Sequence, residues 1–496
     1  MDRSLDDAHP AMMRRCLTTL AIAAMAVATS AHVGEGNVYF AGDAGPYPVE
    51  VSVLLPGVVP GLAQIAVQVN ADGVRHVTVQ PVYWQTSTGG APAPDEATLV
   101  PGEARLYTAR LWLMTPGSYS VRVHVDGERG SGELFIPVNN VATRRLAMQR
   151  PLGILLLGLG AFLAVGLLTI VGAAVREGML PPGQEPDRRL VRRSWILRGA
   201  WVVGIALALL GGRAWWSSVD AAYRRNLERA LEVRTTVSEK AGARVATMEL
   251  VDSGFATRTP LVPDHGKLMH LFLVRDDGAA FAHLHPSRDS MRFSAELPPI
   301  PAGRYRVYGD VVHASGFART LTDTVDVGQT GTSERWQESD PDASWIHAGA
   351  TSGSLAVVPG GTITWERPET ITAGATGLLR FAARDSSGRP MSLEPYMGMK
   401  AHGAVERVDG GVFVHLHPMG TISMAAQRQF ERRSRGDTTL VPTTDSPAPA
   451  HESHEVPGVI TFPYAFPSAG RYRVWVQVKN AGQVLTGAFV TDVRAR

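Results

Sequence analysis

The stretch Pro395–Met424, PYMGMKAHGAVERVDGGVFVHLHPMGTISM, gathers three histidines and four methionines around an Asp-Gly pair. A closely similar stretch, Pro263–Pro286, reads PDHGKLMHLFLVRDDGAAFAHLHP and aligns with it without a gap. In both copies a histidine, an Asp-Gly pair and a His-Leu-His-Pro sequence fall at the same spacing. An internal repeat of this kind implies one supersecondary unit that is used twice.

The repeated unit has the pattern of a β-hairpin. An Asp-Gly pair between two apolar runs is typical of a hairpin closed by a type I′ turn, in which both central residues have positive φ. With the first Asp-Gly pair at that turn, Phe272 lies opposite His283 and His270 lies opposite His285. Because side chains alternate between the two faces of a strand, these three histidines are expected on one face.

The second copy follows the same count. His417 is placed opposite His402, and His415 opposite Ala404. Directly opposed Cβ atoms lie about 5 Å apart, which brings the three imidazoles of one copy within reach of one ion. We therefore expect one metal site in each repeat. The alternative is a hydrogen-bonded polar cluster that only fixes the hairpin.

The two expected sites differ in the softness of their ligands. Thioether sulfur suits Cu(I), whereas imidazole suits copper, zinc, iron and nickel. His265 stands in the first copy where Met397 stands in the second, and Lys267 stands where Met399 does. The expected ligands are His265, His270, His283 and His285 in the first copy, and His402, His415, His417, Met397, Met399, Met419 and Met424 in the second. Copper is the expected ion and zinc is the alternative.

Residues 1–31 have the pattern of a secretory signal, with a basic start, an apolar run and small residues at its end. The only cysteine, Cys16, lies inside this segment. We therefore expect a mature chain without a thiol, which excludes disulfides, thiolate zinc sites and cysteine nucleophiles. Cleavage after residue 31 would make His32 the first residue, and its amino group and imidazole together could chelate Cu(II).

Two apolar runs, 152–175 and 195–216, are long enough to span a bilayer. The segment between them, 176–194, is rich in arginine and is expected to be a cytoplasmic loop by the positive-inside rule. Neither run has an ionisable residue at its centre, which favours an anchor over a transport path. Together with a cleaved signal, this pattern predicts a bacterial inner-membrane protein with both large regions facing the periplasm.

The remaining sequence reads as short strands separated by turn residues, which indicates β-sandwiches. Ala302–Val307 and Ala469–Val474 share the sequence AGRYRV, so the repeat extends beyond the hairpin. The predicted fold class is all-β, with three Ig-like β-sandwich domains and a two-helix transmembrane hairpin between the first and the second. The expected domains are residues 32–143, 235–328 and 344–496. Residues 428–456 are expected to form a long loop inside the third domain.

These features predict a membrane-anchored envelope protein that handles or senses a transition metal, with a metal-donor or metal-acceptor protein as its partner. The net charge of +2 and the scattered arginines argue against nucleic acid, and no small-molecule substrate is indicated. One alternative is a metal-free adhesion or assembly module. Another is a zinc- or copper-dependent enzyme, because three histidines leave one position open for water. Glu406, on the His402 face, would then be the candidate base.

The Asp-Gly hairpin followed by Phe-x-His-Leu-His-Pro, together with the Ala-Gly-x-Tyr-x-Val strand, resembles YtkA-like and FixH-like periplasmic Ig-like modules. The resemblance covers the C-terminal half, and it implies a module found near copper-handling and heavy-metal systems. The N-terminal region is similar to CopC-like copper proteins in its β pattern and in His32. Neither resemblance supplies a catalytic residue.

Overall fold

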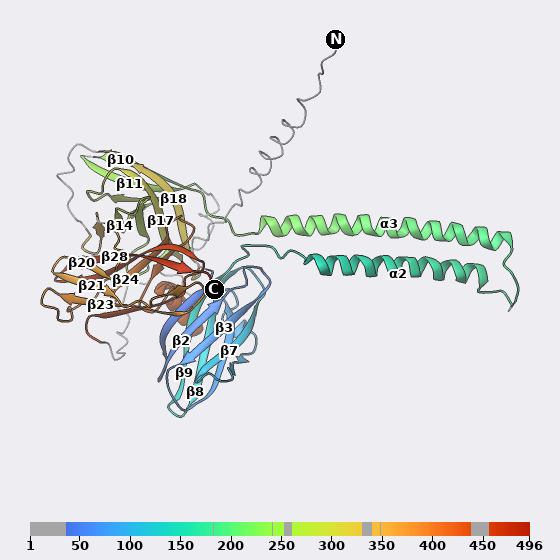
Figure 1. Ribbon diagram of the computed structural model, residues 1–496, viewed down its shortest axis with the longest axis horizontal. Helices are drawn as coiled ribbons and strands as arrows, with labels where there is room; N and C mark the ends of the chain where they lie inside the picture. The colour runs from blue at the N-terminus through green and yellow to red at the C-terminus, as the bar shows by residue number, and fades with distance from the viewer. Residues whose placement is uncertain are drawn as a thin grey trace, which may run out of the picture. The chain divides into compact units, whose positions relative to one another are not determined.

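The computed structural model describes residues 36–181, 183–240, 242–251, 260–329, 340–347, 349–437 and 456–496. The expected signal segment and His32 lie outside these residues. Two compact units are present: one comprises residues 57–61 and 141–229, and the other holds the remaining β-rich chain. The chain is mostly β, with antiparallel sheets and two long apolar helices (Figure 1).

The first β region, residues 36–140, contains two sheets around one core. One sheet runs β1 (Val38–Ala44), β2 (Tyr47–Leu54), β3 (Gly61–Val69), β7 (Leu106–Leu113) and β6 (Thr98–Leu99). The other runs β5 (Asp95–Glu96), β4 (Val74–Tyr83), β8 (Gly117–Gly127) and β9 (Gly130–Asn140), with the short 3₁₀ helix η1 (Thr88–Gly90) after β4. Burial alternates along β2 and β3, as the sequence pattern predicts for strands with one face in a core.

The second β region, residues 230–329, also has two sheets. The first runs β10 (Val233–Lys240), β11 (Ala243–Leu250), β16 (Arg292–Glu296) and β15 (Ser287–Asp289). The second runs β12 (Leu261–Val262), β17 (Gly303–His313), β13 (His270–Arg275), β14 (Phe281–Leu284) and β19 (Ser344–Ile346), and β18 (Ala318–Val327) pairs with β17. β19 was expected in the third domain, but its backbone pairs with β14 and so extends the sheet of the second.

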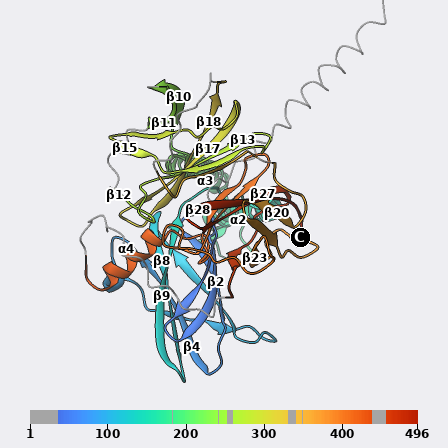
Figure 2. The same cartoon turned by 90° about the vertical axis from the view of Figure 1, so that its left-hand side faces the viewer.

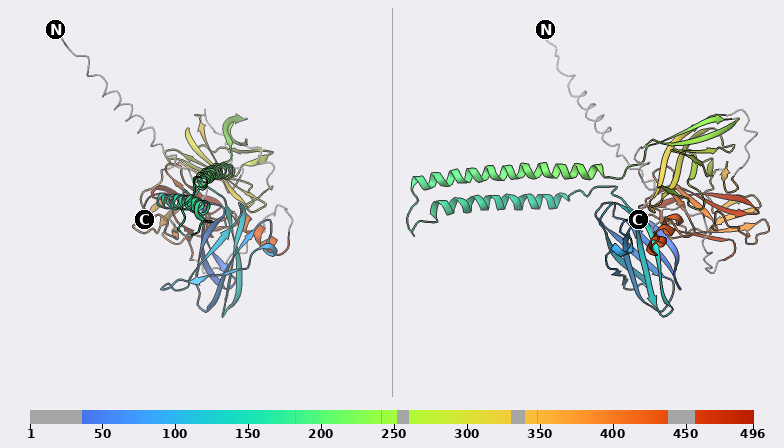
Figure 3. Two further views of the ribbon diagram at one scale, coloured as in Figure 1. Left: turned by 90° about the vertical axis from the view of Figure 1, so that its right-hand side faces the viewer. Right: turned by 180° about the vertical axis from the view of Figure 1, so that it is seen from behind.

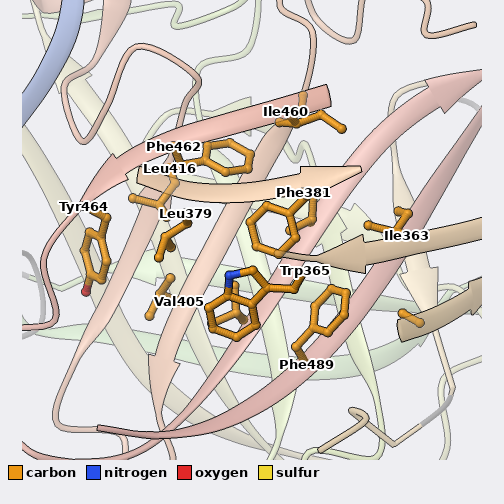
Figure 4. Packing of buried hydrophobic residues seen from close by; sticks show 14 of the residues in the cluster. Ile363, Trp365, Leu379, Phe381, Val405, Leu416, Ile460, Phe462, Tyr464 and Phe489 are labelled. Atoms are coloured by element: carbon orange, nitrogen blue, oxygen red, sulfur yellow. The ribbon is translucent and has the colours of Figure 1, made fainter. Parts of the chain in front are cut away.

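The third β region, residues 355–496, repeats this arrangement. One sheet runs β20 (Leu355–Val358), β21 (Gly361–Trp365), β23 (Gly377–Asp385) and β26 (Val459–Tyr464). The other runs β22 (Ile371–Thr372), β28 (Gln483–Arg494), β27 (Gly470–Asn480), β24 (His402–Arg407) and β25 (Phe413–Leu416). Aromatic side chains such as Trp365, Phe381 and Phe489 fill the core between the two sheets (Figure 4).

A short helix, α4 (Met424–Ser434), occupies the start of the segment that the sequence predicts as a loop. The loop prediction is wrong there because Ser423 caps the helix, accepting a hydrogen bond from the Ala426 N–H at 3.1 Å, and good helix formers follow. The helix lies beside β9 (Figure 2), and Phe430 packs edge-on against Trp84 at a ring separation of 5.3 Å. Residues 438–455 lie outside the described part of the chain.

The strand that begins with Gly-x-Tyr carries the same backbone feature in all three β regions. Gly117, Gly303 and Gly470 begin β8, β17 and β27 with φ of 139°, 150° and 149°, which a residue with a side chain rarely adopts. The tyrosine two residues later bonds back to the residue four positions before it: the hydroxyl of Tyr305 donates to the Pro301 carbonyl, and that of Tyr472 to the Ser468 carbonyl. In the first region the Tyr119 hydroxyl accepts from the Thr115 N–H. This is the tyrosine corner typical of Ig-like sheets.

The two apolar helices are α2 (Arg150–Glu177) and α3 (Arg188–Arg225), and both are long and apolar enough to cross a membrane. They run side by side (Figures 1 and 3), and the Ser194 hydroxyl donates to the Gly172 carbonyl between them at 3.0 Å. The expected loop 176–194 is too long: α3 already begins at Arg188, because Asp187 caps it by accepting from the Leu190 N–H. The helix also continues to Arg225, beyond the expected end of the span.

The two hairpins have the predicted register. Phe272 pairs with His283, and Ala404 pairs with His415. The predicted type I′ turn is wrong, because only the glycine of each Asp-Gly pair has positive φ, 75° at Gly278. The turn closes one residue earlier, where the Gly278 N–H donates to the Arg275 carbonyl at 2.7 Å. The strand register is still the predicted one, because the same number of residues separates the two paired strands with either turn.

Candidate metal centre

The second and third β regions pack the faces of their hairpin sheets against each other. Aromatic side chains interleave in a symmetric manner: Phe281 stacks on Trp475 at 4.6 Å, and Phe413 stacks on Tyr308 at 3.9 Å. Each stack joins one side chain of the second region to one of the third. The buried cluster that contains them is separate from the cores inside the two regions. The repeat therefore creates an interface in which equivalent faces meet.

Glu406 lies in this interface and has no exposed surface. Its carboxylate accepts from Arg306 at 2.7 Å, from Arg473 at 2.8 Å and from the Tyr308 hydroxyl at 3.0 Å. Both oxygens are thus engaged in charge-assisted hydrogen bonds, two of them from the other β region. This arrangement does not leave Glu406 available as the catalytic base considered from the sequence, and it makes Glu406 a link between the repeats.

The same interface buries seven histidines, which we call the histidine cluster: His265, His270, His283, His285, His402, His415 and His417. Six of them stand on the hairpins at the predicted positions. The seventh, His265, lies in a tight turn in which the Asp264 and Lys267 backbones bond to each other at 2.9 and 3.0 Å. His265 has φ of 53° and Gly266 of 79°, so the type I′ turn lies here.

The histidines sort into two groups of three whose ligand atoms lie within 4.8 Å of one another. The first triad is His265, His402 and His417, and the second triad is His270, His283 and His415. Each triad takes histidines from both β regions. The sequence predicts one site inside each repeat, whereas these two groups combine histidines of both repeats, because the hairpins face each other. The ring centres of the three hairpin histidines within one repeat are also close, at 4.8 to 5.3 Å in the second region and 4.5 to 5.4 Å in the third.

The ring positions fit shared ions. A metal–nitrogen bond of about 2.0 Å puts the centres of two imidazoles on one tetrahedral ion about 5 Å apart. Ring centres in the first triad are 4.9, 5.1 and 5.2 Å apart, and those in the second are 5.0, 5.3 and 5.6 Å apart. Both triads thus have the spacing of histidines that hold one ion.

Backbone carbonyls orient the first triad. The Nδ1 of His265 lies 3.0 Å from the Met397 carbonyl, and the Nδ1 of His417 lies 3.0 Å from the Ile422 carbonyl. A carbonyl only accepts, so each Nδ1 carries the proton and each Nε2 keeps its lone pair. Both Nε2 atoms are buried and have no hydrogen-bond partner among the described residues, and neither ring nitrogen of His402 has one there. Metal-binding histidines are commonly oriented in this way through the nitrogen that does not bind the ion.

The second triad holds two lone pairs face to face. The Nε2 of His270 donates to the Asp264 carbonyl at 3.1 Å, and the Nδ1 of His283 donates to the Gln477 side-chain oxygen at 2.8 Å. The remaining nitrogens, His270 Nδ1 and His283 Nε2, lie 3.1 Å apart, and neither carries a proton in these tautomers. Two facing acceptors repel, whereas about 3 Å is the spacing of neighbouring nitrogens on one metal ion.

Carboxylates orient two further histidines. Asp340 Oδ2 lies 2.9 Å from His285 Nδ1, and Asp310 Oδ2 lies 3.5 Å from His415 Nδ1. The Nε2 atoms of both histidines are buried without a hydrogen-bond partner in the described part of the chain. His285 belongs to neither triad, although its ring centre lies 4.8 Å from that of His283.

Burial keeps the cluster uncharged. Removal from water lowers the pKa of His417 to about 4. The pKa values of four other histidines fall well below the usual value, first because of burial and then because neighbouring imidazoles would repel a second charge; these are His270, His283, His402 and His415. Burial also lowers the pKa of His285. Neutral imidazole is the form that binds a metal ion.

The four candidate methionines lie on different elements and do not form one group around a histidine triad. Met419 packs against the hydrophobic core of the first β region, next to a strand-like contact between Phe40 and Gly420. Met424 is the first residue of α4 and is buried. Met397 occupies the turn equivalent to that of His265, with φ of 48°, and its carbonyl orients His265. Met399 closes the same turn.

Several residues of the site have no signal in the sequence. Asp264, Asp310, Asp340 and Gln477 orient imidazoles, and the last three lie on strands or loops far along the chain from the histidines that they contact. Asp264 alone stood within the recognised repeat, next to His265. The others become visible only once the two sheets face each other.

Comparison with solved structures gives matches of low identity. A tetra-tandem repeat from the extending region of a large adhesion protein is 10% identical, covering 89% of this chain and 73% of its own, with a TM-score of 0.15. A putative membrane anchored protein from Corynebacterium diphtheriae is 10% identical, covering 92% and 93%, with a TM-score of 0.14. These scores carry no inference about fold or function.

Sequence comparison adds one match. No curated protein matches the chain. Residues 227–329 and 356–495 match a family model described as a domain of unknown function, DUF8832, and these two stretches contain the hairpins that carry the histidine cluster.

Proposed function

We propose that this protein is anchored in a membrane and binds a transition metal ion in the histidine cluster. Copper is the first candidate for that ion. The observation that carries the proposal is the set of buried imidazole nitrogens without partners, above all both ring nitrogens of His402 and the two lone pairs that face each other between His270 and His283. A buried polar atom without a partner costs about 1–3 kcal/mol. An ion bound in each triad would take one nitrogen lone pair from every ring, including one nitrogen of His402 and the two lone pairs that face each other between His270 and His283.

The donor set narrows the choice of ion. Imidazole binds copper, zinc, iron and nickel, and the triads contain no carboxylate. A buried site of neutral ligands resists high charge, because an ion that leaves water loses its hydration. Cu(I) carries one charge and accepts three imidazoles, so it fits this environment without a further ligand, whereas a divalent ion needs an accompanying anion that offsets part of its charge. Zinc is the second candidate ion. Thioether sulfur as a further copper ligand remains part of the proposal, from Met397, Met399, Met419 and Met424.

The proposed setting is the envelope of a bacterium. We infer three Ig-like β-sandwiches, supported by the paired sheets and the tyrosine corners. α2 and α3 would cross the inner membrane, with the arginines at the start of α3 on the cytoplasmic side and the β regions in the periplasm. A protein that donates or accepts copper would be the partner, with metal handling or sensing as the role.

The test is a copper competition titration on the full-length protein in detergent. A chromophoric Cu(I) chelator reports how much copper the protein withholds, and a zinc titration runs in parallel. His402→Ala should weaken binding strongly, whereas the matched variant His347→Ala, which removes an exposed histidine outside the cluster, should not. Absence of binding in the folded wild-type protein would leave the cluster as a structural element and favour the metal-free adhesion module.

A further inference from the structure

The two triads are in contact with each other. The ring centres of His415 and His417, which belong to different triads, lie 4.5 Å apart, and those of His402 and His415 lie 5.4 Å apart. These separations are as short as those within either triad, where ring centres are 4.9 to 5.6 Å apart. Ions in the two triads would therefore be close neighbours.

Each triad supplies three ligands, and a four-coordinate ion has one position left. The described part of the cluster contributes no carboxylate to either triad that could lie between the ions. Two divalent ions at this separation repel each other strongly in a buried site, where the effective dielectric constant is low. A small anion that occupies the open position of both ions would offset that repulsion.

We infer that the cluster is one binuclear copper centre, with three histidines for each ion and a small bridging anion such as hydroxide between the two Cu(II) ions. This inference rests on the proposed function. It differs from a pair of independent sites because both ions share one buried space, and each is held by histidines from the two β regions. In this grouping neither repeat alone supplies all three histidines of a triad.

A bridged pair of Cu(II) ions also differs from two separate ions in its magnetic properties. Two Cu(II) ions joined by one bridging oxygen atom couple their unpaired electrons, so their ordinary electron paramagnetic resonance signal is lost. Two Cu(II) ions in separate sites keep one full signal each. The signal per bound copper thus distinguishes one centre from two sites without any measurement of activity.

The experiment loads the full-length protein in detergent with Cu(II), removes excess metal, and measures total copper and the integrated resonance signal. The wild-type protein is compared with His417→Ala, which removes a ligand of the first triad, and with His283→Ala, which removes one of the second. His265→Ala is a second variant for the first triad, since its side chain lies in a turn rather than in a sheet. Acid denaturation afterwards releases all copper, and recovery of the full signal shows that the metal was Cu(II).

The inference predicts two coppers per wild-type chain with far less than one signal per copper, and one copper with a full signal in each variant. Two coppers with a full signal each would overturn it and leave two independent sites. One copper in the wild-type protein, lost in the variants of both triads, would overturn it and leave a single site. No bound copper in the folded wild-type protein would refute the proposed function as well.

Discussion

Acidification of the metal-free protein should unfold it, with His417 as a measurable part of the effect. A histidine in an unfolded chain takes up a proton near pH 6.5, whereas folded His417 does so near pH 4. Between these values the unfolded state binds more protons, so lowering the pH favours unfolding. The penalty is absent above pH 6.5, grows as the pH falls, and is complete below pH 4.

The size of the effect follows from the pKa difference. One pKa unit corresponds to about 1.4 kcal/mol, so His417 alone should cost the folded state about 3 kcal/mol at pH 4. Five more histidines of the cluster have lowered pKa values and act in the same direction. Because a domain is typically stable by about 5–15 kcal/mol, the part from His417 alone is a sizeable share of the stability of the metal-free protein, and the other histidines add to it.

The assay is chemical denaturation of the metal-free protein, followed by tryptophan fluorescence, at several pH values between 7.5 and 4. His417→Gln removes one titrating group but keeps a polar side chain. The variant should gain about 3 kcal/mol relative to the wild-type protein as the pH falls from 7 to 4. His347→Ala, which removes an exposed histidine outside the cluster, is the matched control. A free energy of unfolding that does not change between pH 6.5 and 4 would refute the assignment of neutral, buried imidazoles.

Three further outcomes are expected. Glu406→Gln leaves Arg306 and Arg473 without their full counter-charge and should destabilise the repeat interface by about 3–5 kcal/mol, measured by urea denaturation; a loss below about 1 kcal/mol would contradict the network. Trp475→Ala removes a buried stack on Phe281 and should cost about 3–5 kcal/mol in the same assay, with an unchanged midpoint as the contrary result. Copper at about a thousand times its dissociation constant should raise the free energy of unfolding by about 4 kcal/mol, and metal-free and copper-loaded thermal midpoints that coincide would speak against binding to the folded state.

The hairpins could be predicted because their information is local. Alternation along β13 and β14, together with the loop length, fixed that Phe272 pairs with His283. The turn type could not be predicted from Asp-Gly alone, because the Asp277 side chain accepts a hydrogen bond from the Ala279 N–H at 2.9 Å and stabilises a turn with a single left-handed residue. Strand pairing tolerates both turns.

The composition of the site could not be predicted because it depends on how two sheets face each other. The sequence indicates that His402 and His417 share one hairpin face, and the structure places both in the first triad. Nothing local indicates that His265, from the other repeat, completes that triad, or that His415 belongs with His270. Such pairings arise from packing of Phe281 on Trp475 and of Phe413 on Tyr308, far along the chain.

The helix α4 shows a different limit. Its sequence after Ser423 contains good helix formers, but the arginines and the Ser-, Thr- and Pro-rich residues that follow resemble a solvated linker. Burial of Phe430 against Trp84 favours the helix over a loop, and this contact joins the third β region to the first.

X-ray absorption spectroscopy at the copper edge of the Cu(I)-loaded, full-length protein tests the central claim most directly. The histidine cluster predicts stoichiometric copper with a first shell of about three nitrogen atoms near 2.0 Å and the outer-shell scattering of imidazole rings. A first shell dominated by sulfur would move the ion to the methionines. A folded protein that retains no copper, or copper whose spectrum is unchanged in His402→Ala, would contradict the account.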